Sequence, residues 1–436
     1  MQIAVIGSGI SGLLTARLLA SRHQVCLYEA SATIGGHTCT IDVELAGRSF
    51  AVDTGFMVFN ERTYPNFCQL LDLIGIDSQP SDMSFSVRCD RSGLEYEGSS
   101  LSGLFAQRRN IFRPRFYRLL ADILRFNRVA IAALQKLNDD QTLGHFVQQH
   151  HLGSDFVDQY LVPMGAAIWS TRPRDMLDFP AKFTLAFFHN HGLLQIRDRP
   201  VWRTIPGGAR RYALRLAADI PEIQLSAPIR QITRTADGVW VSAMGADPRH
   251  FDHVVLGCHS DQALRLLADA TATEREILAA IPYQQNEVIV HTDTSILPRS
   301  QRAWASWNYL TPRVTDEQET GNVAVTYDLS RLQRVNSPTP ILATLNTPYE
   351  IAPAKVLRRM QFQHPVFSRA SAIAQSRWAE INGPRRTWFC GAYWGHGFHE
   401  DGVRSALAVA REFGVTLEAC TAVCTKERSG TVATAR

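Results

Sequence analysis

Several patterns are missing from this sequence of 436 residues, and each absence excludes a class of protein. No apolar run approaches the roughly 18 residues that a membrane-spanning helix requires. The eight cysteines are scattered without C-x-x-C spacing, so we expect reduced thiols and neither a disulfide framework nor a metal site. The formal net charge of +4 is too small to indicate nucleic acid as a partner.

The N-terminus lacks the basic and apolar segment of a secretory signal, because Met1 leads directly into an apolar strand. Together with the reduced thiols, this predicts a cytoplasmic protein. Internal repeats are also absent, and the sequence predicts no particular oligomeric state. Apolar residues make up 45% and charged residues 20% of a chain long enough for two domains, so we expect an ordinary globular protein with two cores.

The first 40 residues carry the strongest pattern, which is an apolar strand, a glycine turn, an amphipathic helix and a second strand over residues 24–28. Gly7, Gly9 and Gly12 fit the spacing G-x-G-x-x-G, which permits a tight turn, a bare backbone against a pyrophosphate, and close packing of helix on strand. The first amides of the helix would face the phosphates. We therefore predict that a dinucleotide is bound at Gly7, Ser8, Gly9, Ile10, Ser11 and Gly12.

An acid at the end of the second strand indicates which dinucleotide fits. Glu29 follows Gly7 by 22 positions, where its carboxylate can accept both hydroxyls of an adenosine ribose and would repel a 2′-phosphate. Gly35 and Gly36 come too soon for the next helix of an NAD-type unit. This second glycine pair indicates another backbone approach to the same pyrophosphate.

The motif E-A-x-x-x-x-G-G-H-T that starts at Glu29 resembles the FAD-dependent amine oxidase and phytoene desaturase superfamily. The resemblance implies FAD as the cofactor and an α/β fold, in which a Rossmann-like FAD-binding domain of the glutathione-reductase type is joined to a discontinuous α+β substrate domain. His37 stands where the superfamily usually has an arginine. The resemblance implies FAD contacts at Glu29, Ala30, Gly35, Gly36, His37 and Thr38.

Five further stretches resemble one subgroup of that superfamily: DTGFMVFNERTYP, PMGAAIWS, FHNHGLL, IPGGARRY and CGAYWGHGFHEDG. The subgroup comprises predicted flavoproteins often encoded beside cyclopropane-fatty-acid-synthase-like methyltransferases, including the desaturase of furan fatty acid synthesis. This resemblance runs over nearly all of residues 1–415. It implies removal of hydrogen from an apolar substrate, such as a methylated or unsaturated fatty acyl chain of a phospholipid. Two alternatives stay open: a flavin amine oxidase that releases hydrogen peroxide, and a non-catalytic flavin-binding partner of a lipid methyltransferase.

The same resemblance places residues from later in the chain along the cofactor. Gly55, Phe56 and Met57 would lie beside the flavin ring, although this stretch also fits a buried strand with a turn. Ile229 would contact the adenine through its main chain.

A second helix, near the C-terminus, is expected to reach the flavin at its O2 and N1 edge. If it starts at about Gly402, the amide of Val403 would stabilise negative charge on the reduced ring. Gly391 matches the glycine that precedes a ribityl-binding acid, but Ala392 replaces that acid. We expect that Asp401 takes over this contact or that the contact is lost.

Candidates for proton transfer lie in the same C-terminal stretch. Amine oxidases of the superfamily commonly keep a lysine that holds a water at flavin N5, but only Lys182 of the four lysines lies in a suitable segment. Tyr393 follows the flavin-facing strand and would lie at the ring face or pack beneath the cofactor. His396 and His399 can move a proton near neutral pH or only cap the loop. We select His399 and Tyr393 as the catalytic candidates.

Residues 104–134 form a basic segment with seven arginines and a single acid, Asp122. Pro114 suits a helix start, and apolar residues recur at helical spacing from Phe116 to Leu124. Such a helix can lie on an anionic membrane surface, at the inner face of the membrane. It can equally pack its apolar face on its own domain, with solvated arginines outside.

We predict that the two domains are built from alternating segments. Residues 1–60, 201–265 and 386–417 form the FAD-binding domain, and residues 61–200 and 266–385 form the substrate domain. Residues 418–436 are polar and small, which predicts a disordered tail. Five aromatic side chains of the helical part can be core residues or can line an apolar substrate tunnel: Trp169, Phe179, Phe183, Phe187 and Phe188.

Overall fold

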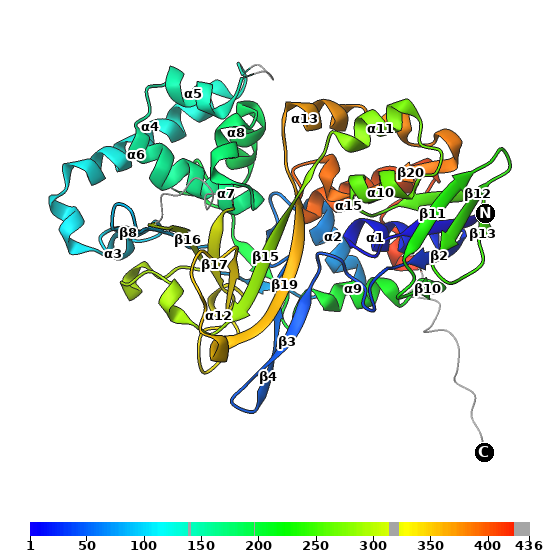
Figure 1. Ribbon diagram of the computed structural model, residues 1–436, viewed down its shortest axis with the longest axis horizontal. Helices are drawn as coiled ribbons and strands as arrows, with labels where there is room; N and C mark the ends of the chain where they lie inside the picture. Colours follow the sequence, from blue (N-terminus) through cyan, green and yellow to red (C-terminus); the bar gives the residue numbers. More distant parts are fainter. Residues whose placement is uncertain (138–140, 196, 314–321, 423–436) are drawn as a thin grey trace.

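The computed structural model describes residues 1–137, 141–195, 197–313 and 322–422. Figure 1 shows two halves, one built around a parallel sheet that contains the N-terminal strand and the other around a larger sheet with a group of helices beside it. We call these the cofactor half and the substrate half. None of the described helices combines the length and apolar character needed to span a bilayer.

The cofactor half is built on a five-stranded sheet in which all neighbours pair in parallel. Its central strands are β1 (Gln2–Ile6), β2 (Gln24–Tyr28) and β14 (His253–Leu256). Strands β10 (Glu222–Gln224) and β20 (Thr387–Phe389) form the edges, so the order is β10-β2-β1-β14-β20. Three separate stretches of the chain supply these strands, and the predicted Rossmann-like fold is confirmed.

Both faces of this sheet are covered, which explains why its strands are apolar at consecutive positions. Ile3 and Val5 point into a core shared with helices, whereas Ala4 and Ile6 point into a core shared with a second, three-stranded sheet. This alternation follows from the two-residue period of a strand. The covering elements are α1 (Ile10–Leu19), α9 (Arg210–Ala217) and α15 (His399–Glu412) on one face, and β11 (Ile229–Arg234), β12 (Val239–Ala243) and β13 (Arg249–Phe251) on the other.

The substrate half contains a seven-stranded mixed sheet with the order β19-β15-β18-β17-β16-β7-β8. Strand β16 pairs in parallel with β7, and every other pair is antiparallel. Two segments far apart in the sequence therefore build one sheet, as predicted for a discontinuous α+β domain. The strands are β7 (Phe85–Cys89), β8 (Leu94–Glu97), β15 (Tyr283–His291), β16 (Trp307–Thr311), β17 (Ala324–Asp328), β18 (Leu342–Leu345) and β19 (Val356–Pro365).

Helices pack beside this sheet and share its apolar core. The longest is α4 (Pro114–Ala133), which begins at Pro114 as predicted, because proline fits the first turn of a helix. Phe126 of α4 is fully buried against Phe146 and Phe156 of neighbouring helices. The other helices of this group are α5 (Leu143–Gln149), α6 (Ser154–Phe156), α7 (Val162–Trp169) and α8 (Ala181–Asn190).

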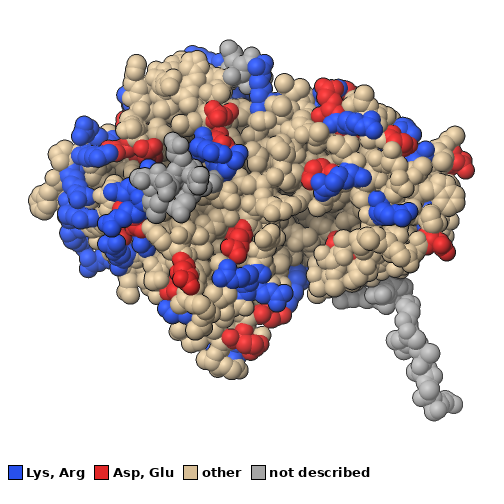
Figure 2. Space-filling view, in the orientation of Figure 1, with Lys and Arg blue, Asp and Glu red and all other residues tan. Residues whose placement is uncertain are grey.

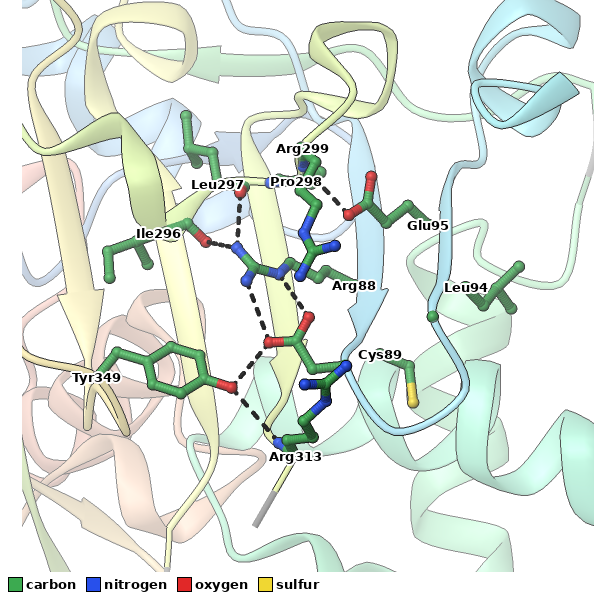
Figure 3. Close-up of polar contacts among 12 residues, drawn as sticks. Arg88, Cys89, Leu94, Glu95, Ile296, Leu297, Pro298, Arg299, Arg313 and Tyr349 are labelled. Atoms are coloured by element: carbon green, nitrogen blue, oxygen red, sulfur yellow. Dashed lines mark hydrogen bonds and ion pairs between the residues drawn. The ribbon is translucent and has the colours of Figure 1, made fainter.

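A buried arginine ties the outer part of this sheet together (Figure 3). The Arg88 guanidinium donates to the carbonyl oxygens of Ile296 and Leu297, at 3.2 and 2.9 Å. Its other nitrogens bind the Asp90 carboxylate, which also accepts the Tyr349 hydroxyl at 2.8 Å. Since a buried guanidinium without acceptors is costly, these contacts hold the connection after β15 against β7.

The remaining elements join the two halves or cover their edges. Strands β3 and β4 form an antiparallel hairpin that turns at Gly47, and β9 lies between β5 and β6 in a small separate sheet. These elements are β3 (Thr40–Leu45), β4 (Arg48–Asp53), β5 (Phe59–Asn60), β6 (Gln79–Pro80), β9 (Trp202–Thr204), α2 (Pro65–Ile74), α3 (Leu101–Leu104), α10 (Ser260–Leu266), α11 (Ala272–Ala279), α12 (Leu329–Leu332), α13 (Arg369–Ser376), α14 (Trp378–Ile381) and α16 (Ala419–Ala422).

The structure differs from two of the predicted boundaries. Helix α2 lies within the range 61–200, yet its Phe67 and Leu70 pack into the core of the cofactor half. The tail was predicted to be disordered from residue 418, but α16 is helical and Cys420 is only 2% exposed. Its carbonyl oxygen accepts a hydrogen bond from the buried guanidinium of Arg17 at 3.0 Å, which requires an ordered acceptor. The rest of the predicted tail, residues 423–436, lies outside the described residues.

Candidate functional site

The glycine turn between β1 and α1 has the geometry that its sequence predicts. A Cβ atom on Gly12 would lie 1.9 Å from the carbonyl oxygen of Gly7, so the helix can approach the strand only without a side chain there. Gly7 has a φ of +99°, a conformation that favours glycine. At Gly9, by contrast, a Cβ atom would meet no described atom within 4 Å. The turn therefore presents a bare backbone to open space, as pyrophosphate binding requires.

The predicted acid and the second glycine pair converge on this turn. The Glu29 carboxylate accepts hydrogen bonds from the amide and the hydroxyl of Ser8, at 2.9 and 2.5 Å. The amide of Gly35 donates to the Ser8 carbonyl at 3.1 Å. The amide of Ala227 donates to the Glu29 carbonyl at 2.9 Å, which brings Ile229, the first residue of β11, close to the predicted ribose position. Ala30 and Gly36 lie at the surface of this region.

The starts of two helices, one near each end of the chain, lie against each other. A Cβ atom on Gly402 would lie 2.8 Å from Cγ2 of Ile10 and 2.9 Å from Oγ of Ser11. The first turn of α15 therefore packs on the first turn of α1. Because helix N-termini attract anions, two such ends side by side suit a bound pyrophosphate and a reduced flavin.

The predicted start of this second helix at Gly402 is wrong by three residues, because α15 begins at His399. The Asp401 carboxylate accepts the amides of His396 and Phe398, at 3.0 and 3.1 Å, and so caps its own helix. The amide of Gly402 already donates to the Phe398 carbonyl, and Val403 lies one turn inside the helix. The free amides at this end are therefore those of residues 399–401.

The carboxyl ends of the parallel strands form one edge, where an open α/β sheet binds its ligands. Tyr393 follows β20 at this edge, is only 3% exposed, and has no hydrogen-bond partner for its hydroxyl among the described residues. The Nε1 atom of the adjacent Trp394 is likewise buried without a partner. A Cβ atom on Gly391 would lie 2.2 Å from the Tyr393 ring. Unpaired buried donors beside the glycine turns fit a site that a bound cofactor completes.

A cavity of ≈ 520 Å³ starts beside this region and runs into the substrate half. Its inner end is lined by the predicted flavin contacts Gly55, Phe56 and Met57, together with His37 and His399. Most other lining side chains are aromatic or aliphatic, from strands of the seven-stranded sheet and from α4, α7 and α8. Among the described lining residues there is no aspartate, glutamate or lysine.

The sequence allows five aromatic residues to be core residues or to line a tunnel, and the structure divides them between these two roles. Trp169 and Phe187 line the cavity. Phe179, Phe183 and Phe188 are not among its lining residues and pack behind it. Lys182, the only lysine in a suitable segment, is exposed on α8 and does not line the cavity.

His399 is held at the cavity wall by two hydroxyl groups. Its Nε2 atom lies 2.8 Å from the Tyr212 hydroxyl and 3.1 Å from Oγ1 of Thr38. Its ring stacks on Phe56, with 3.5 Å between the ring centroids and an angle of 10°. Tyr212 ends the stretch IPGGARRY, but its role could not be predicted from the sequence, because its partner His399 lies 187 residues away. Tyr393 does not line this cavity, so the two predicted catalytic residues are not brought together there.

A pair of histidines joins the two halves. Nε2 of His37 lies 3.2 Å from Nε2 of His364, and Nδ1 of His364 lies 2.8 Å from the side-chain nitrogen of Asn286. Because the Asn286 amide nitrogen can only donate, the His364 proton is assigned to Nε2, from where it donates to His37. His37, the residue at the position of the superfamily's arginine, is thus a hydrogen-bond acceptor on the cavity wall.

All five histidines that line the cavity are neutral near pH 7. Burial disfavours the charged imidazolium and so lowers the pKa of His37, His191 and His396 to about 4. Burial also lowers the pKa of His364 and His399 well below the ordinary value. The inner cavity is therefore apolar, with neutral hydrogen-bonding groups at the cofactor end.

A sequence model described as flavin containing amine oxidoreductase matches residues 10–413. The chain belongs to the flavin-containing amine oxidoreductase family. It is a flavin-dependent oxidoreductase with FAD as its cofactor, as predicted. The contacts assigned to individual residues stay predictions, and the bare backbone at Gly9 and the two helix starts fit this cofactor. No curated protein matches the sequence.

Solved structures with this fold are similar over almost the whole chain. A CLA-producing fatty acid isomerase from P. acnes is 18% identical with a TM-score of 0.68, covering 94% of this chain and 98% of its own. Putrescine oxidase bound to putrescine is 13% identical with a TM-score of 0.68, covering 95% and 99%. Cyclohexylamine oxidase from Brevibacterium oxydans IH-35A is 17% identical with a TM-score of 0.64, covering 95% and 99%. At these identities the likeness establishes the fold alone.

Proposed function

We propose that this oxidoreductase removes hydrogen from a fatty acyl chain, methylated or unsaturated, that is part of a phospholipid. The observation that carries the proposal is the cavity of ≈ 520 Å³, whose lining is mostly apolar and includes Phe56 and His399 at the predicted flavin end. A substrate that fills it is apolar over most of its surface. The sequence resemblance to flavoproteins encoded beside lipid methyltransferases supports the same substrate class.

The electrostatics of the cavity support an acyl substrate over an amine. The described lining offers no carboxylate to bind an ammonium group, and its five histidines are neutral. Transfer of an unpaired cation into such a cavity is costly. A neutral methylene chain meets no such cost. The likeness to a fatty acid isomerase adds support, since that protein of the same fold handles a fatty acid.

The chain's own residues bind the substrate, exclude water and hold a proton. Bound FAD supplies the redox chemistry by accepting hydrogen. Trp169 and Phe187 hold the acyl chain in a dry passage. His399 can hold or move a proton at Nε2, because its neutral ring is fixed between the hydroxyls of Tyr212 and Thr38. Tyr212 is fully buried and acts as a positioning residue for His399.

The test is anaerobic reduction of the purified FAD-loaded protein by candidate substrates. Phospholipids with unsaturated or methylated acyl chains are expected to bleach the flavin absorbance near ~450 nm. Mass spectrometry of the recovered lipid is expected to show the loss of two hydrogen atoms. Putrescine serves as the matched amine and is expected to cause no bleaching.

Other outcomes of this test identify the alternatives. Bleaching by amines with release of hydrogen peroxide in air, and none by lipids, would overturn the proposal in favour of an amine oxidase. A flavin that dithionite reduces but no lipid or amine reduces would favour the non-catalytic partner of a lipid methyltransferase.

A further inference from the structure

Helix α4 carries two apolar stripes, and the fold covers only one of them. Phe126 represents the inner stripe and is fully buried. Tyr117, Leu124 and Ile131 are 47%, 49% and 43% exposed. Their seven-residue spacing places them on one face of the helix, so they form a continuous outer stripe. Packing on the substrate half therefore explains the inner stripe and leaves the outer one about half exposed. Within the outer stripe, the Tyr117 ring contacts Phe105 and its hydroxyl donates to the Ile111 carbonyl, which keeps this side chain on the surface of the segment.

This concentration of exposed apolar side chains is local. Of the thirteen large apolar side chains exposed in the described residues, six lie in the segment 101–131. Scattered apolar residues are normal on a protein surface, but a contiguous group indicates an interaction site. The six are Leu101, Ile111, Phe112, Tyr117, Leu124 and Ile131, of which Phe112 is 85% exposed.

Arginines surround the same stripe. Arg118, Arg125 and Arg128 are exposed on α4, and no ion pair between described residues includes them. Arg115 is the member of this segment that does pair, with Asp155 at 2.5 Å. Figure 2 shows blue side chains gathered at the end of the molecule where Figure 1 places α3, α4 and α6. We call this surface, the exposed side chains of residues 101–131, the α4 face.

The substrate cavity opens on the α4 face. Leu124 is exposed and also lines the cavity, and Leu120, one turn earlier, lines it from further inside. The other exposed lining residues are Gly98 and Ser99, directly before α3, and Arg199. An acyl chain can therefore pass from the α4 face along the helix to the predicted flavin end and remain in apolar surroundings.

We propose that the α4 face docks on an anionic lipid bilayer and that the acyl substrate enters the cavity directly from it. The inference rests on the proposed function, because an acyl chain is the substrate that a bilayer supplies. The arginines bind lipid phosphates, and the outer stripe lies among the headgroups. A second copy of this chain fits the face poorly, because two such faces would bring arginine clusters of like charge together.

Sedimentation of the FAD-loaded protein with vesicles tests the docking. The protein is expected to bind vesicles of phosphatidylcholine mixed with phosphatidylglycerol at low ionic strength, and to be released as the salt concentration rises. It is expected to bind phosphatidylcholine vesicles far more weakly. The Arg118→Gln/Arg125→Gln variant is expected to bind the anionic vesicles about 25-fold more weakly, since each arginine near the surface contributes about fivefold.

Matched variants separate the α4 face from total charge and total hydrophobicity. Arg22→Gln/Arg411→Gln removes two exposed arginines of the cofactor half and is expected to bind as the unaltered protein does. Phe112→Ser is expected to weaken binding, whereas Met244→Ser, at a 64% exposed site of the cofactor half, is not. Equal losses in both members of either pair would overturn the proposal. Absence of vesicle binding at low salt, or a dimer that Phe112→Ser dissociates, would overturn it as well.

Turnover distinguishes failure of docking from failure of the proposed function. The Arg118→Gln/Arg125→Gln variant is expected to keep its rate on detergent-dispersed acyl substrate and to lose rate on substrate embedded in anionic vesicles. If the protein binds vesicles but oxidises no acyl lipid, the proposed function fails and docking stands. If it oxidises acyl lipid equally in both forms without binding vesicles, docking alone is overturned.

Discussion

The cofactor half and the substrate half position their functional groups by different means. In the cofactor half, backbones touch at glycines, such as Gly12 on Gly7 and Gly257 on Gly12, where a Cβ atom would lie within 2.8 Å of a backbone atom. In the substrate half, side chains make the contacts that position the elements. The Arg88 guanidinium, for example, donates to two carbonyl oxygens. Backbone contacts leave no room for a larger residue. Where side chains make the contacts, a substitution lowers the stability of the fold in proportion to the number of atoms removed.

The two halves meet at the loop after β2, which makes one contact of each kind, one through its backbone and one through a side chain. A Cβ atom on Gly36 would lie 3.1 Å from the Cα atom of Gly9, whereas the next residue, His37, makes a side-chain hydrogen bond to His364. The loop thus couples the cofactor turn to the cavity wall. A substitution at Gly36 is therefore expected to reduce cofactor retention, whereas one at His37 is expected to reduce substrate turnover.

The largest effect is expected at Gly12. Its replacement by alanine places a Cβ atom 1.9 Å from the Gly7 carbonyl oxygen, so the β1–α1 contact cannot form and soluble folded protein should be lost. Gly9→Ala is the matched control, because no described atom lies near its added Cβ and its φ of −64° suits alanine. We expect Gly9→Ala to fold with normal circular dichroism but to retain little flavin. Equal behaviour of the two variants would contradict this assignment of roles.

Glu29→Arg is expected to remove the cofactor and keep the fold. The side chain is only partly buried at the end of β2, and a guanidinium there would replace the acceptor for the ribose hydroxyls with donors. The purified variant should be colourless near ~450 nm, where flavins absorb. Glu29→Gln keeps one acceptor oxygen and should retain part of the flavin. A yellow Glu29→Arg protein would count against the predicted ribose contact.

Phe126→Ala tests whether the stability of the substrate half falls in proportion to the buried side-chain atoms that are removed. Removal of this fully buried ring is expected to lower the free energy of unfolding by about 3–5 kcal/mol, because a cavity remains. Ile131→Ala on the outer stripe of the same helix is expected to change it by at most about 0.5 kcal/mol, because this side chain is 43% exposed. Urea denaturation measures both. A comparable loss at Ile131 would show that the fold, not a partner, covers the outer stripe.

Tyr212→Phe should affect turnover while FAD stays bound. The change deletes the hydroxyl that holds His399 and leaves the stacking of His399 on Phe56 in place. We expect kcat on acyl substrate to fall about tenfold with little change in KM, as for one lost hydrogen bond. A rise in KM alone would assign Tyr212 to substrate binding. His399→Gln should cost more, and an unchanged rate in that variant would remove His399 from the mechanism.

Much of the cofactor half could be predicted from the sequence because its determinants are local. The glycine spacing and the acid after residues 24–28 lie within one strand–turn–helix–strand unit, and β2 has the predicted bounds. The start of α15 was missed because Asp401 reaches back to amides at residues 396 and 398. An acid before a helix and an acid in its first turn look alike in the sequence.

The substrate half could be predicted only as alternating elements. The contacts at the cavity wall could not be predicted, because they join residues that are far apart in the sequence. Tyr212 meets His399, and His37 meets His364, across 187 and 327 residues. No local pattern marks such a pair. The basic segment 104–134 was recognised, but its periodicity could not show that α4 is apolar on both its inner and its outer side. That distinction needs the position of the sheet beneath the helix.

The smallest expected effect is an absence of response to pH, and it distinguishes the buried histidines from ordinary ones. Burial lowers the pKa of His399 well below its usual value, so the imidazole stays neutral from pH 8 down to pH 6. A surface histidine would instead gain a proton over this interval, with its midpoint near ~6.5. We therefore expect the rate of flavin bleaching by acyl substrate to be level between pH 7 and 8. Any change below pH 7 is expected to persist in His399→Gln, because burial raises the pKa of Asp401, which caps α15, to about 6. A fall centred near ~6.5 that His399→Gln abolishes would mean that water reaches the ring, and the cofactor end of the cavity would not be dry.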